Sequence, residues 1–380
     1  MAETTRVVAG WPSFPIENDE IEAWVTEEGG HLAPVFFDRG QRRFQPFYIA
    51  PWAEEKWPDQ PKLLQVLRGD FFCLPFGGND AAYRGEKHPV HGETANERWT
   101  PVGRIETDQE KRLELELKTT VRPGTVRKVI RLVTGHQVVY CRHLLTGYQG
   151  RMCLGHHAIL RFPDQPGSGL FSCSRFLFGQ VAAGPVEDPA AGGYSILKPG
   201  ARFSRLTRVP LVTGEMTDLS RYPARAGYED IVSLVSNPSL PFAWSAVSFP
   251  EEGYLWFGLK NPRQLACTLL WMSNGGRHYP PWNGRNRNTM GVEEVTSYFH
   301  YGLKESASPN PFSREGIKTY LSLSPRSSTI ISYLMGCVAM PPKFGAVKEI
   351  RPDREGKTAL IIGEGARVET PLDWNWILSA

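Results

Sequence analysis

Polar and apolar residues alternate most clearly between positions 112 and 118. Leucine occupies every second position from 113 to 117, and charged residues stand between the leucines. A period of two predicts a β-strand that buries one face. A turn at Pro123-Gly124 follows, and apolar runs then occupy residues 126–133, 138–145 and 152–162. Strands at this spacing, separated by glycine-containing turns, predict an antiparallel meander.

The second half of the chain continues this pattern. Apolar runs suited to strands lie at residues 231–235, 242–249, 254–259, 265–272 and 289–303. No helical periodicity extends beyond about three turns, which is near the mean length of an α-helix. The 37 glycines and 31 prolines favour short strands joined by turns. We therefore expect an all-β protein with a single domain over residues 1–380, in which residues 341–380 form a C-terminal extension with one strand at 359–362.

The charge and composition of the chain indicate which kinds of binding partner and which compartment to expect. The formal net charge of +3 is spread along the chain, so nothing favours nucleic acid or an anionic membrane as a partner. The longest apolar run, residues 330–340, is too short to cross a bilayer, and the first residues lack the apolar segment of a signal peptide. The six cysteines form no CxxC pair, which favours buried free thiols in a reducing compartment. We expect a cytoplasmic monomer or homodimer without a nucleotide cofactor, because no phosphate-binding glycine motif is present.

A polar segment follows the buried run at residues 71–76. It carries His88, His91, Glu93 and Arg98 and ends in Trp99. Imidazoles, a carboxylate and a guanidinium beside an indole indicate a site rather than packing. The two histidines and the glutamate suit zinc, nickel or iron. Their spacing matches no known metal motif and Pro89 disfavours a helix, so we expect no metal and keep a metal site as an alternative.

Two adjacent histidines lie in the run at 152–162. Alternation along a strand places His156 and His157 on opposite faces. His156 shares its face with apolar residues and is expected in the core. His157 shares its face with a mixed set of residues and is the better candidate for a cleft, where an imidazole can act as acid or base near neutral pH.

Two adjacent glutamates lie in the middle of the run at 289–303. Because neighbouring residues of a strand face opposite ways, Glu293 or Glu294 must point inward, where a carboxylate is costly unless it is paired or used. Apolar residues flank both faces, so the pattern does not choose between the two.

The loop at residues 274–288 combines Trp282 with other aromatic residues, asparagines and three arginines. Aromatic faces stack on the C–H faces of a polyhydroxylated ring, while amide and guanidinium donors bind its hydroxyls. The loop therefore suits a sugar, and its arginines leave a phosphorylated or acidic sugar open. A solvated surface loop is the alternative.

Three segments together resemble motifs of the aldose 1-epimerase (galactose mutarotase-like) superfamily. They are Arg68-Gly69-Asp70 through Pro75-Phe76-Gly77 with His91-Gly92 and Trp99, then Gly155-His156-His157-Ala158, and finally Met290-Gly291-Val292-Glu293-Glu294. They occur in the family's order across most of the chain. The resemblance implies a large antiparallel β-sandwich, a β-supersandwich, with a sugar cleft on one face. It also implies His91 as a substrate binder, His157 as the general acid and Glu293, rather than Glu294, as the general base.

The activity implied by the resemblance is interconversion of the anomers of a sugar without a cofactor. A carboxylate and an imidazolium would act together near pH 7 if pairing raises the pKa of the histidine. Further substrate contacts are expected from Arg68, Asn79, Arg98 and Trp282. Two alternatives stay open: a lyase or isomerase that acts on an acidic or oligomeric sugar, and a non-catalytic carbohydrate-binding protein.

Overall fold

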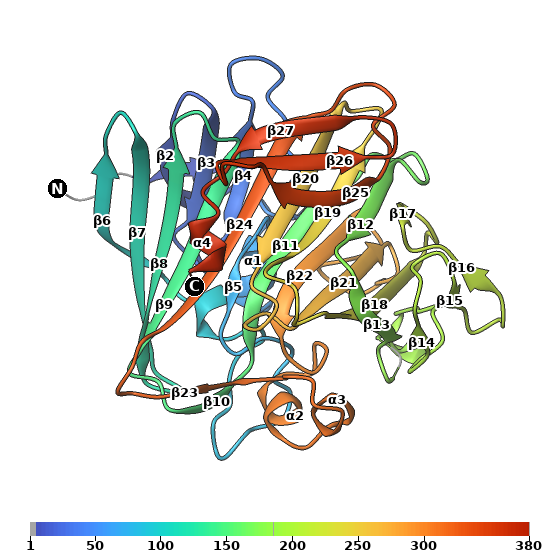
Figure 1. Ribbon diagram of the computed structural model, residues 1–380. Coiled ribbons are helices and arrows are strands. Elements are labelled where there is room, and N and C mark those ends of the chain that lie inside the picture. Colours follow the sequence, from blue (N-terminus) through green and yellow to red (C-terminus); the bar gives the residue numbers. More distant parts are fainter. Residues whose placement is uncertain (1–4, 185, 380) are drawn as a thin grey trace.

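The computed structural model describes residues 5–184 and 186–379, and two large β-sheets dominate this part of the chain (Figure 1). One sheet has nine strands in the order β17 (Arg221–Tyr222), β12 (Gly169–Cys173), β19 (Ala243–Phe249), β20 (Tyr254–Lys260), β24 (Thr329–Ala339), β9 (Val138–Thr146), β8 (Gly124–Val133), β7 (Glu110–Thr119) and β6 (Thr100–Glu106). Every ladder in this sheet is antiparallel.

The second sheet carries the candidate histidines and glutamates. Its seven described strands run in the order β14 (Arg202–Phe203), β13 (Phe176–Val181), β18 (Tyr228–Ser236), β21 (Cys267–Asn274), β22 (Thr289–Thr296), β11 (Leu154–Arg161) and β5 (Phe72–Cys73). These ladders are antiparallel too. The two sheets pack face to face: the ring of Phe72 stacks on His143 of β9 at 3.9 Å. The all-β fold class and the large antiparallel sandwich are therefore confirmed.

Smaller elements surround the sandwich. A four-stranded sheet joins β1 (Arg6–Val8), β2 (Trp11–Glu17), β3 (Ile21–Thr26) and β4 (Leu32–Phe37). Two-stranded sheets pair β10 (Gly150–Met152) with β23 (Leu321–Leu323) and β15 (Val209–Pro210) with β16 (Met216–Thr217). Three of the short helices are α1 (Lys62–Val66), α2 (Leu303–Ala307) and α3 (Pro311–Arg314), and 3₁₀ turns lie at Glu93–Ala95 and Pro189–Ala191.

The leucine alternation gives β7, in which Leu113 and Leu115 are fully buried. The meander is confirmed for β7, β8 and β9, which are neighbours in the nine-stranded sheet. The fourth run does not continue the meander, because the far edge of β9 is already paired with β24. The run breaks at Cys153, and β11 crosses to the other sheet, where it pairs with β22 and β5.

The C-terminal residues cover the outer face of the nine-stranded sheet. The expected strand is β26 (Thr358–Gly363), but it lies between two strands that the sequence did not predict, β25 (Val347–Pro352) and β27 (Arg367–Pro371), and helix α4 (Asn375–Leu378) follows. Ile361 of β26 and Trp376 of α4 pack in one apolar cluster with Trp244 of β19. Figure 1 shows this segment, in red, on the side away from β18, β21 and β22.

The cysteines match a further expectation. All six cysteines lie in the described part of the chain, are unpaired, and are buried except for the half-buried Cys173. Within the described residues, no helix is both long enough and apolar enough to cross a membrane.

Candidate active site

The register between β11 and β22 pairs the candidate residues across the two strands. His157 lies opposite Glu293, and His156 lies opposite Glu294. Residues directly opposite each other in an antiparallel ladder point to the same face of the sheet. The pair of His157 and Glu293 therefore lies on one face of the sheet, and the pair of His156 and Glu294 lies on the other.

The inner face of the sheet holds His156 and Glu294 in the core. His156 is fully buried, and its Nδ1 lies 2.9 Å from Oδ2 of Asp70. Glu294 accepts hydrogen bonds from Ser245 at 2.6 Å and Thr268 at 2.7 Å and forms a buried ion pair with Lys260. These partners satisfy both carboxylate oxygens, so Glu294 stabilises the packing of the two sheets.

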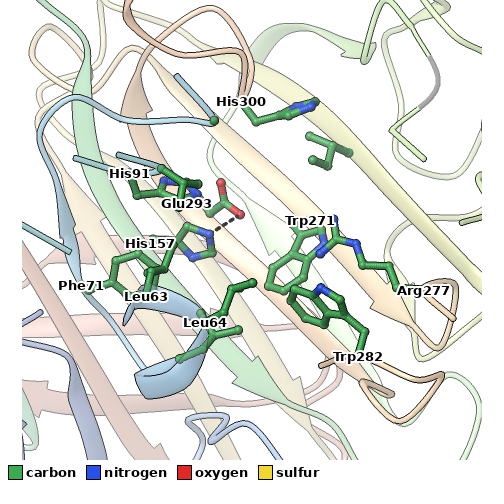
Figure 2. A pocket seen from close by; sticks show the side chains of 14 residues that line it. Leu63, Leu64, Phe71, His91, His157, Trp271, Arg277, Trp282, Glu293 and His300 are labelled. Atoms are coloured by element: carbon green, nitrogen blue, oxygen red, sulfur yellow. Dashed lines mark ion pairs between the residues drawn. The ribbon is translucent and has the colours of Figure 1, made fainter. Parts of the chain in front are cut away.

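The outer face holds His157 and Glu293 beside a cavity of about 190 Å³. Nε2 of His157 lies 3.2 Å from Oε1 of Glu293, and both side chains are buried. Figure 2 shows the pair with His91 on one side and Trp271 and Trp282 on the other. Of the residues predicted for the site, His91, His157, Glu293 and Trp282 line this cavity.

Local packing fixes the two members of the pair. The ring of His157 stacks on Phe71 at 4.6 Å, and its backbone N–H donates to the carbonyl of Phe71 at 2.9 Å. Gly291, two residues before Glu293, faces the same side of β22. A Cβ at Gly291 would lie 2.6 Å from Oε1 of Glu293, so glycine at this position leaves the space that the carboxyl group occupies.

His91 enters the cavity from a tight loop. Its φ is +57°, a conformation that few non-glycine residues adopt and that is enriched at functional sites. Its N–H donates to the carbonyl of Gly77 at 2.7 Å, and its Nδ1 accepts from the N–H of Gly77 at 3.3 Å. The ring therefore carries its hydrogen on Nε2, and its centre lies 5.0 Å from that of His157.

The wall opposite His91 consists of two indoles and a guanidinium. Trp271 and Trp282 meet edge to face at 6.0 Å, and the guanidinium of Arg277 lies 4.5 Å from the centre of the Trp282 ring. Nε of Arg277 donates to Glu187 at 2.5 Å, and Nε1 of Trp271 donates to Glu229 at 3.1 Å. These contacts hold flat apolar surfaces toward the cavity, which suits the C–H face of a sugar ring.

Burial favours the uncharged forms of Glu293 and of the histidines in the cavity. It raises the pKa of Glu293 well above its ordinary value. It lowers the pKa of His157 well below 6.5, and the neighbouring His91 adds to this effect. The same cause lowers the pKa of His91 to about 3 and that of His300 to about 4. The expectation that pairing raises the pKa of the histidine is therefore wrong, because loss of water outweighs the attraction between the partners.

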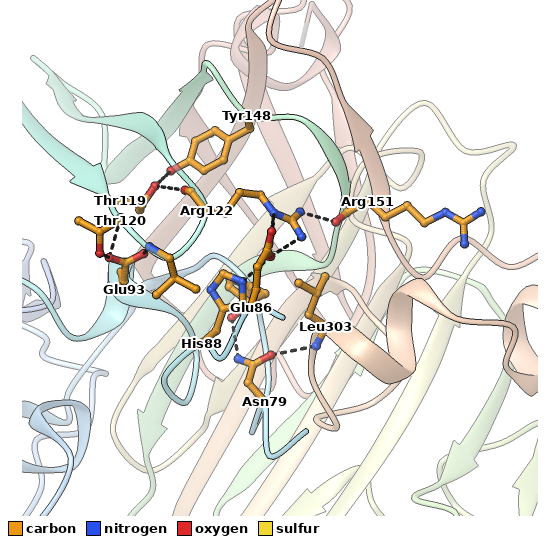
Figure 3. Close-up of polar contacts among 12 residues, drawn as sticks. Asn79, Glu86, His88, Glu93, Thr119, Thr120, Arg122, Tyr148, Arg151 and Leu303 are labelled. Atoms are coloured by element: carbon orange, nitrogen blue, oxygen red, sulfur yellow. Dashed lines mark hydrogen bonds and ion pairs between the residues drawn. The ribbon is translucent and has the colours of Figure 1, made fainter. Parts of the chain in front are cut away.

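Three residues predicted to bind substrate have their polar atoms committed elsewhere. The buried guanidinium of Arg68 donates to the carbonyls of Val66, Val8 and Ala9 at 3.1, 3.0 and 2.9 Å. Asn79 donates to the carbonyls of three residues and accepts from the N–H of Leu303 at 2.9 Å (Figure 3). Arg98 lies on the surface, paired with Glu27 at 2.5 Å. None of the three lines the cavity: Arg68 and Asn79 bind backbone groups that hold the fold, and Arg98 forms a surface ion pair.

The three residues considered as metal ligands, His88, His91 and Glu93, do not face a common point. Nε2 of His88 lies 3.0 Å from Glu86, which in turn binds Arg122 (Figure 3). Glu93 accepts hydrogen bonds from Thr120 and Val121, and His91 faces the cavity. Within residues 5–184 and 186–379, no group of three or more histidine, cysteine, aspartate or glutamate side chains is placed to hold a metal ion.

Sequence reasoning did not single out Trp271, Arg277 and His300, which are among the residues that line the cavity. Trp271 sits beside Gly291 in the β21–β22 register, and this pairing has no signal in the sequence. Arg277 belongs to the loop that was noted for sugar binding, but the pattern did not separate it from the other two arginines. Nothing in the segment around His300 distinguishes it from a surface histidine.

Comparison with known proteins identifies the architecture. No family model matches the chain, and no curated protein matches its sequence. Solved structures do match: a galactose mutarotase-like protein from Clostridium acetobutylicum has 10% identity and a TM-score of 0.55, with 89% of this chain and 98% of that chain covered. The chain has the galactose mutarotase-like fold.

Two further solved structures share the galactose mutarotase-like fold with this chain. A galactose mutarotase related enzyme from Lactobacillus acidophilus has 12% identity and a TM-score of 0.53, with 86% of this chain and 98% of that chain covered. A candidate aldose 1-epimerase from Klebsiella pneumoniae subsp. pneumoniae has 15% identity and a TM-score of 0.57, with 87% and 80% covered. At these identities the likeness concerns the fold, and the function has to be argued from the cavity.

Proposed function

We propose that the protein is an aldose 1-epimerase-like isomerase that interconverts the anomers of a sugar in this cavity. The observation that carries the proposal is the contact of 3.2 Å between His157 and Glu293 on the cavity face of β11 and β22. A proton donor and a proton acceptor next to each other are what anomerisation requires. The indole wall and a volume of about 190 Å³ suit one sugar ring, since pockets for larger, drug-sized ligands occupy about 300 to 1,000 Å³.

The reaction needs two proton transfers at neighbouring oxygens. Glu293 removes the proton from the anomeric hydroxyl O1 while His157 delivers a proton to the ring oxygen O5. The C1–O5 bond breaks, and its electron pair is taken up with the proton at O5 as C1=O1 forms. Rotation about C1–C2 exposes the other face of the carbonyl, and closure of the ring with both transfers reversed gives the other anomer.

The buried pair holds the protons that this cycle uses. Because burial disfavours charge on both partners, the empty cavity favours a protonated Glu293 next to a neutral His157. Transfer of one proton along the Nε2···Oε1 contact gives a carboxylate and an imidazolium with the same total number of protons. A sugar whose O1 and O5 bind the two groups stabilises this second form, and each transfer contributes about 10²- to 10⁴-fold to the rate.

His91 and Trp282 act as binding residues in this proposal. Nδ1 of His91 is occupied by the N–H of Gly77, so Nε2–H is free to donate to a sugar oxygen. Trp282 presents its ring to the cavity beside Trp271. We also propose that the protein works in the cytoplasm, where six unpaired thiols stay reduced.

The test is the rate at which pure anomers of common aldoses equilibrate, followed by polarimetry or by one-dimensional NMR. The wild type should accelerate equilibration of at least one sugar, and Glu293→Gln should lose the acceleration while sugar binding measured by calorimetry persists. Binding without acceleration by the wild type would replace the isomerase with a carbohydrate-binding protein. Unchanged acceleration in Glu293→Gln would overturn the role of this residue.

A further inference from the structure

The positive charge that lines the cavity is already balanced by protein groups. Among the described residues that line the cavity, Arg277 carries the guanidinium group. Its Nε lies 2.5 Å from Oε1 of Glu187 and 3.9 Å from Oε2 of Glu229. Tyr279 donates to the second oxygen of Glu187 at 2.9 Å, which holds that carboxylate in place. The three histidines in the cavity are neutral because burial lowers their pKa. A phosphate or carboxylate on the substrate would therefore bury an uncompensated charge, which is strongly unfavourable.

One wall of the cavity is apolar. Leu63 and Leu64 of α1 and the following Leu67 line it. Oδ1 of Asn96 accepts from the N–H of Leu63 at 3.0 Å, and Nδ2 of Asn96 donates to the carbonyl of Gly92 at 2.7 Å. Asn96 therefore fixes the leucine wall against the loop that carries His91. Figure 2 shows Leu63 and Leu64 on the His157 side of the cavity.

The polar side chains in the cavity match a limited set of hydroxyls. With His157 and Glu293 engaged at O5 and O1, the remaining polar side chains on the described lining, apart from the two indoles, are His91, His300 and Arg277. An aldohexopyranose presents further hydroxyls at C2, C3, C4 and C6. A hydroxyl that is buried without a partner loses its hydrogen bonds to water and weakens binding. The three side chains therefore suit a ring with hydroxyls at C2, C3 and C4 and an apolar group at C5.

We propose that the substrate is an uncharged 6-deoxyhexose whose methyl group on C5 packs against Leu63 and Leu64. C5 is bonded to the ring oxygen, so a group on C5 lies on the side of the cavity where His157 delivers its proton. This inference rests on the proposed anomerase function and adds the class of sugar to it. It also separates this cavity from one that selects a phosphorylated or acidic sugar.

Matched sugars test the proposal on the wild-type protein. Each series compares a 6-deoxyhexose with the hexose, pentose, hexose 6-phosphate and uronic acid of the same ring configuration, for example D-fucose, D-galactose, L-arabinose, D-galactose 6-phosphate and D-galacturonate. In at least one of the gluco, galacto and manno series, kcat/KM for the 6-deoxyhexose should exceed the values for the hexose and the pentose by about tenfold or more. The charged sugars should be at least about 100-fold worse than the hexose.

A change in the wall should shift this preference without changing the catalytic pair. Leu64 is half-buried, so Leu64→Gln places an amide at the wall with little cost to the core. We expect it to lower the ratio of kcat/KM for 6-deoxyhexose over hexose toward one. The matched control is Leu177→Gln on β13, because Leu177 is 54% exposed and lies outside the cavity; it should keep the wild-type ratio.

The outcomes separate this inference from the proposed function. Equal or better turnover of the hexose, the pentose or a charged sugar would overturn the deoxysugar inference and leave an anomerase. If no sugar is turned over, the anomerase proposal fails, and calorimetric titration with the same series then decides the inference, since the 6-deoxyhexose should still bind most tightly. If a folded Leu64→Gln variant keeps the wild-type preference, Leu64 is not the residue that selects the methyl group.

Discussion

His157 and Glu293 are direct cross-strand partners, and their side chains meet at 3.2 Å between Nε2 and Oε1. Both residues lie inside neighbouring strands of the seven-stranded sheet, not in loops. The ladder hydrogen bonds of β11 and β22 therefore set the distance between the two groups. A site built on regular strands is held more precisely than one built on loops.

The pair should behave as one catalytic unit. We expect His157→Asn and Glu293→Gln each to lower kcat by about 10²- to 10⁴-fold, because each removes one proton transfer. The double variant should be little slower than the worse single variant, since residues that act as a unit give non-additive losses. Kinetics of all three variants with the best sugar, beside circular dichroism to check folding, provide the measurement. Additive losses would show that the two residues act independently.

Gly291 should position the carboxyl group of Glu293. A Cβ at this position would lie 2.6 Å from Oε1 of Glu293, the flexible end of a side chain, and 3.2 Å from Cβ of Trp271, so Gly291→Ala should move the carboxyl away from His157 and needs only a small shift of Trp271. We expect kcat to fall by at least tenfold while the unfolding midpoint changes little. The matched control is Gly40→Ala, because an added Cβ at Gly40 meets no atom within 4 Å. Wild-type kcat in Gly291→Ala would contradict this positioning role.

Glu294 should matter for stability rather than for chemistry. It is paired with Lys260 between the sheets, and both side chains are 1% exposed. Glu294→Gln leaves a buried ammonium without its counter-charge, which should reduce the free energy of unfolding by about 3 to 5 kcal/mol. Urea unfolding of the variant checks this figure. The double change Lys260→Met with Glu294→Leu should recover most of the loss, and failure to recover would show that the pair adds net stability.

Arg68 and Arg98 should not affect sugar binding. Arg68 holds three backbone carbonyls, two of them on the N-terminal segment at Val8 and Ala9. Arg68→Met should therefore lower stability by about 1 to 3 kcal/mol, since buried carbonyls lose their donors, while the folded variant keeps its KM. Arg98→Gln, on the surface, should change neither quantity. A large rise in KM in either variant, measured by sugar titration, would show that this arginine contributes to sugar binding.

The stability of the protein should fall in mild acid. Burial is the main cause that lowers the pKa of seven histidines below 6.5, namely His31, His88, His91, His136, His143, His157 and His300. The unfolded chain then binds more protons than the folded chain below pH 6.5, so the free energy of unfolding decreases as the pH falls. Three carboxyls with raised pKa, Glu229, Asp230 and Glu293, act in the opposite direction but are fewer.

The size of the decrease in stability can be worked out from the pKa of a single histidine. The pKa of the buried His31 is about 3, so at pH 5 it alone lowers stability by about 2 kcal/mol relative to pH 7.5. Urea unfolding at pH 7.5, 6 and 5 should show a steady decrease, and His31→Gln should flatten it. Constant or rising stability over this range would mean that the raised carboxyls outweigh the histidines.

The sequence by itself determined much of the fold and part of the site. The alternation at 113–117 gave β7, and alternation at 156–157 placed one histidine in the core and the other in the cavity. Such patterns can be recognised in the sequence because the side chains of a strand point to alternate faces of the sheet, whichever strand lies next to it. The resemblance of three short motifs brought His91, His157 and Glu293 into one hypothesis, and these residues do line one cavity.

Tertiary structure decided the rest. Only the pairing of β21 with β22 sets Trp271 beside Gly291, and only the ion pair with Lys260 shows that Glu294 is the glutamate that belongs to the core. Arg68 sits in a motif but binds carbonyls from a segment about 60 residues away. A sequence records each side chain and its local period, whereas pairing, burial and charge balance depend on which distant strands become neighbours, and that is settled only when the whole core packs.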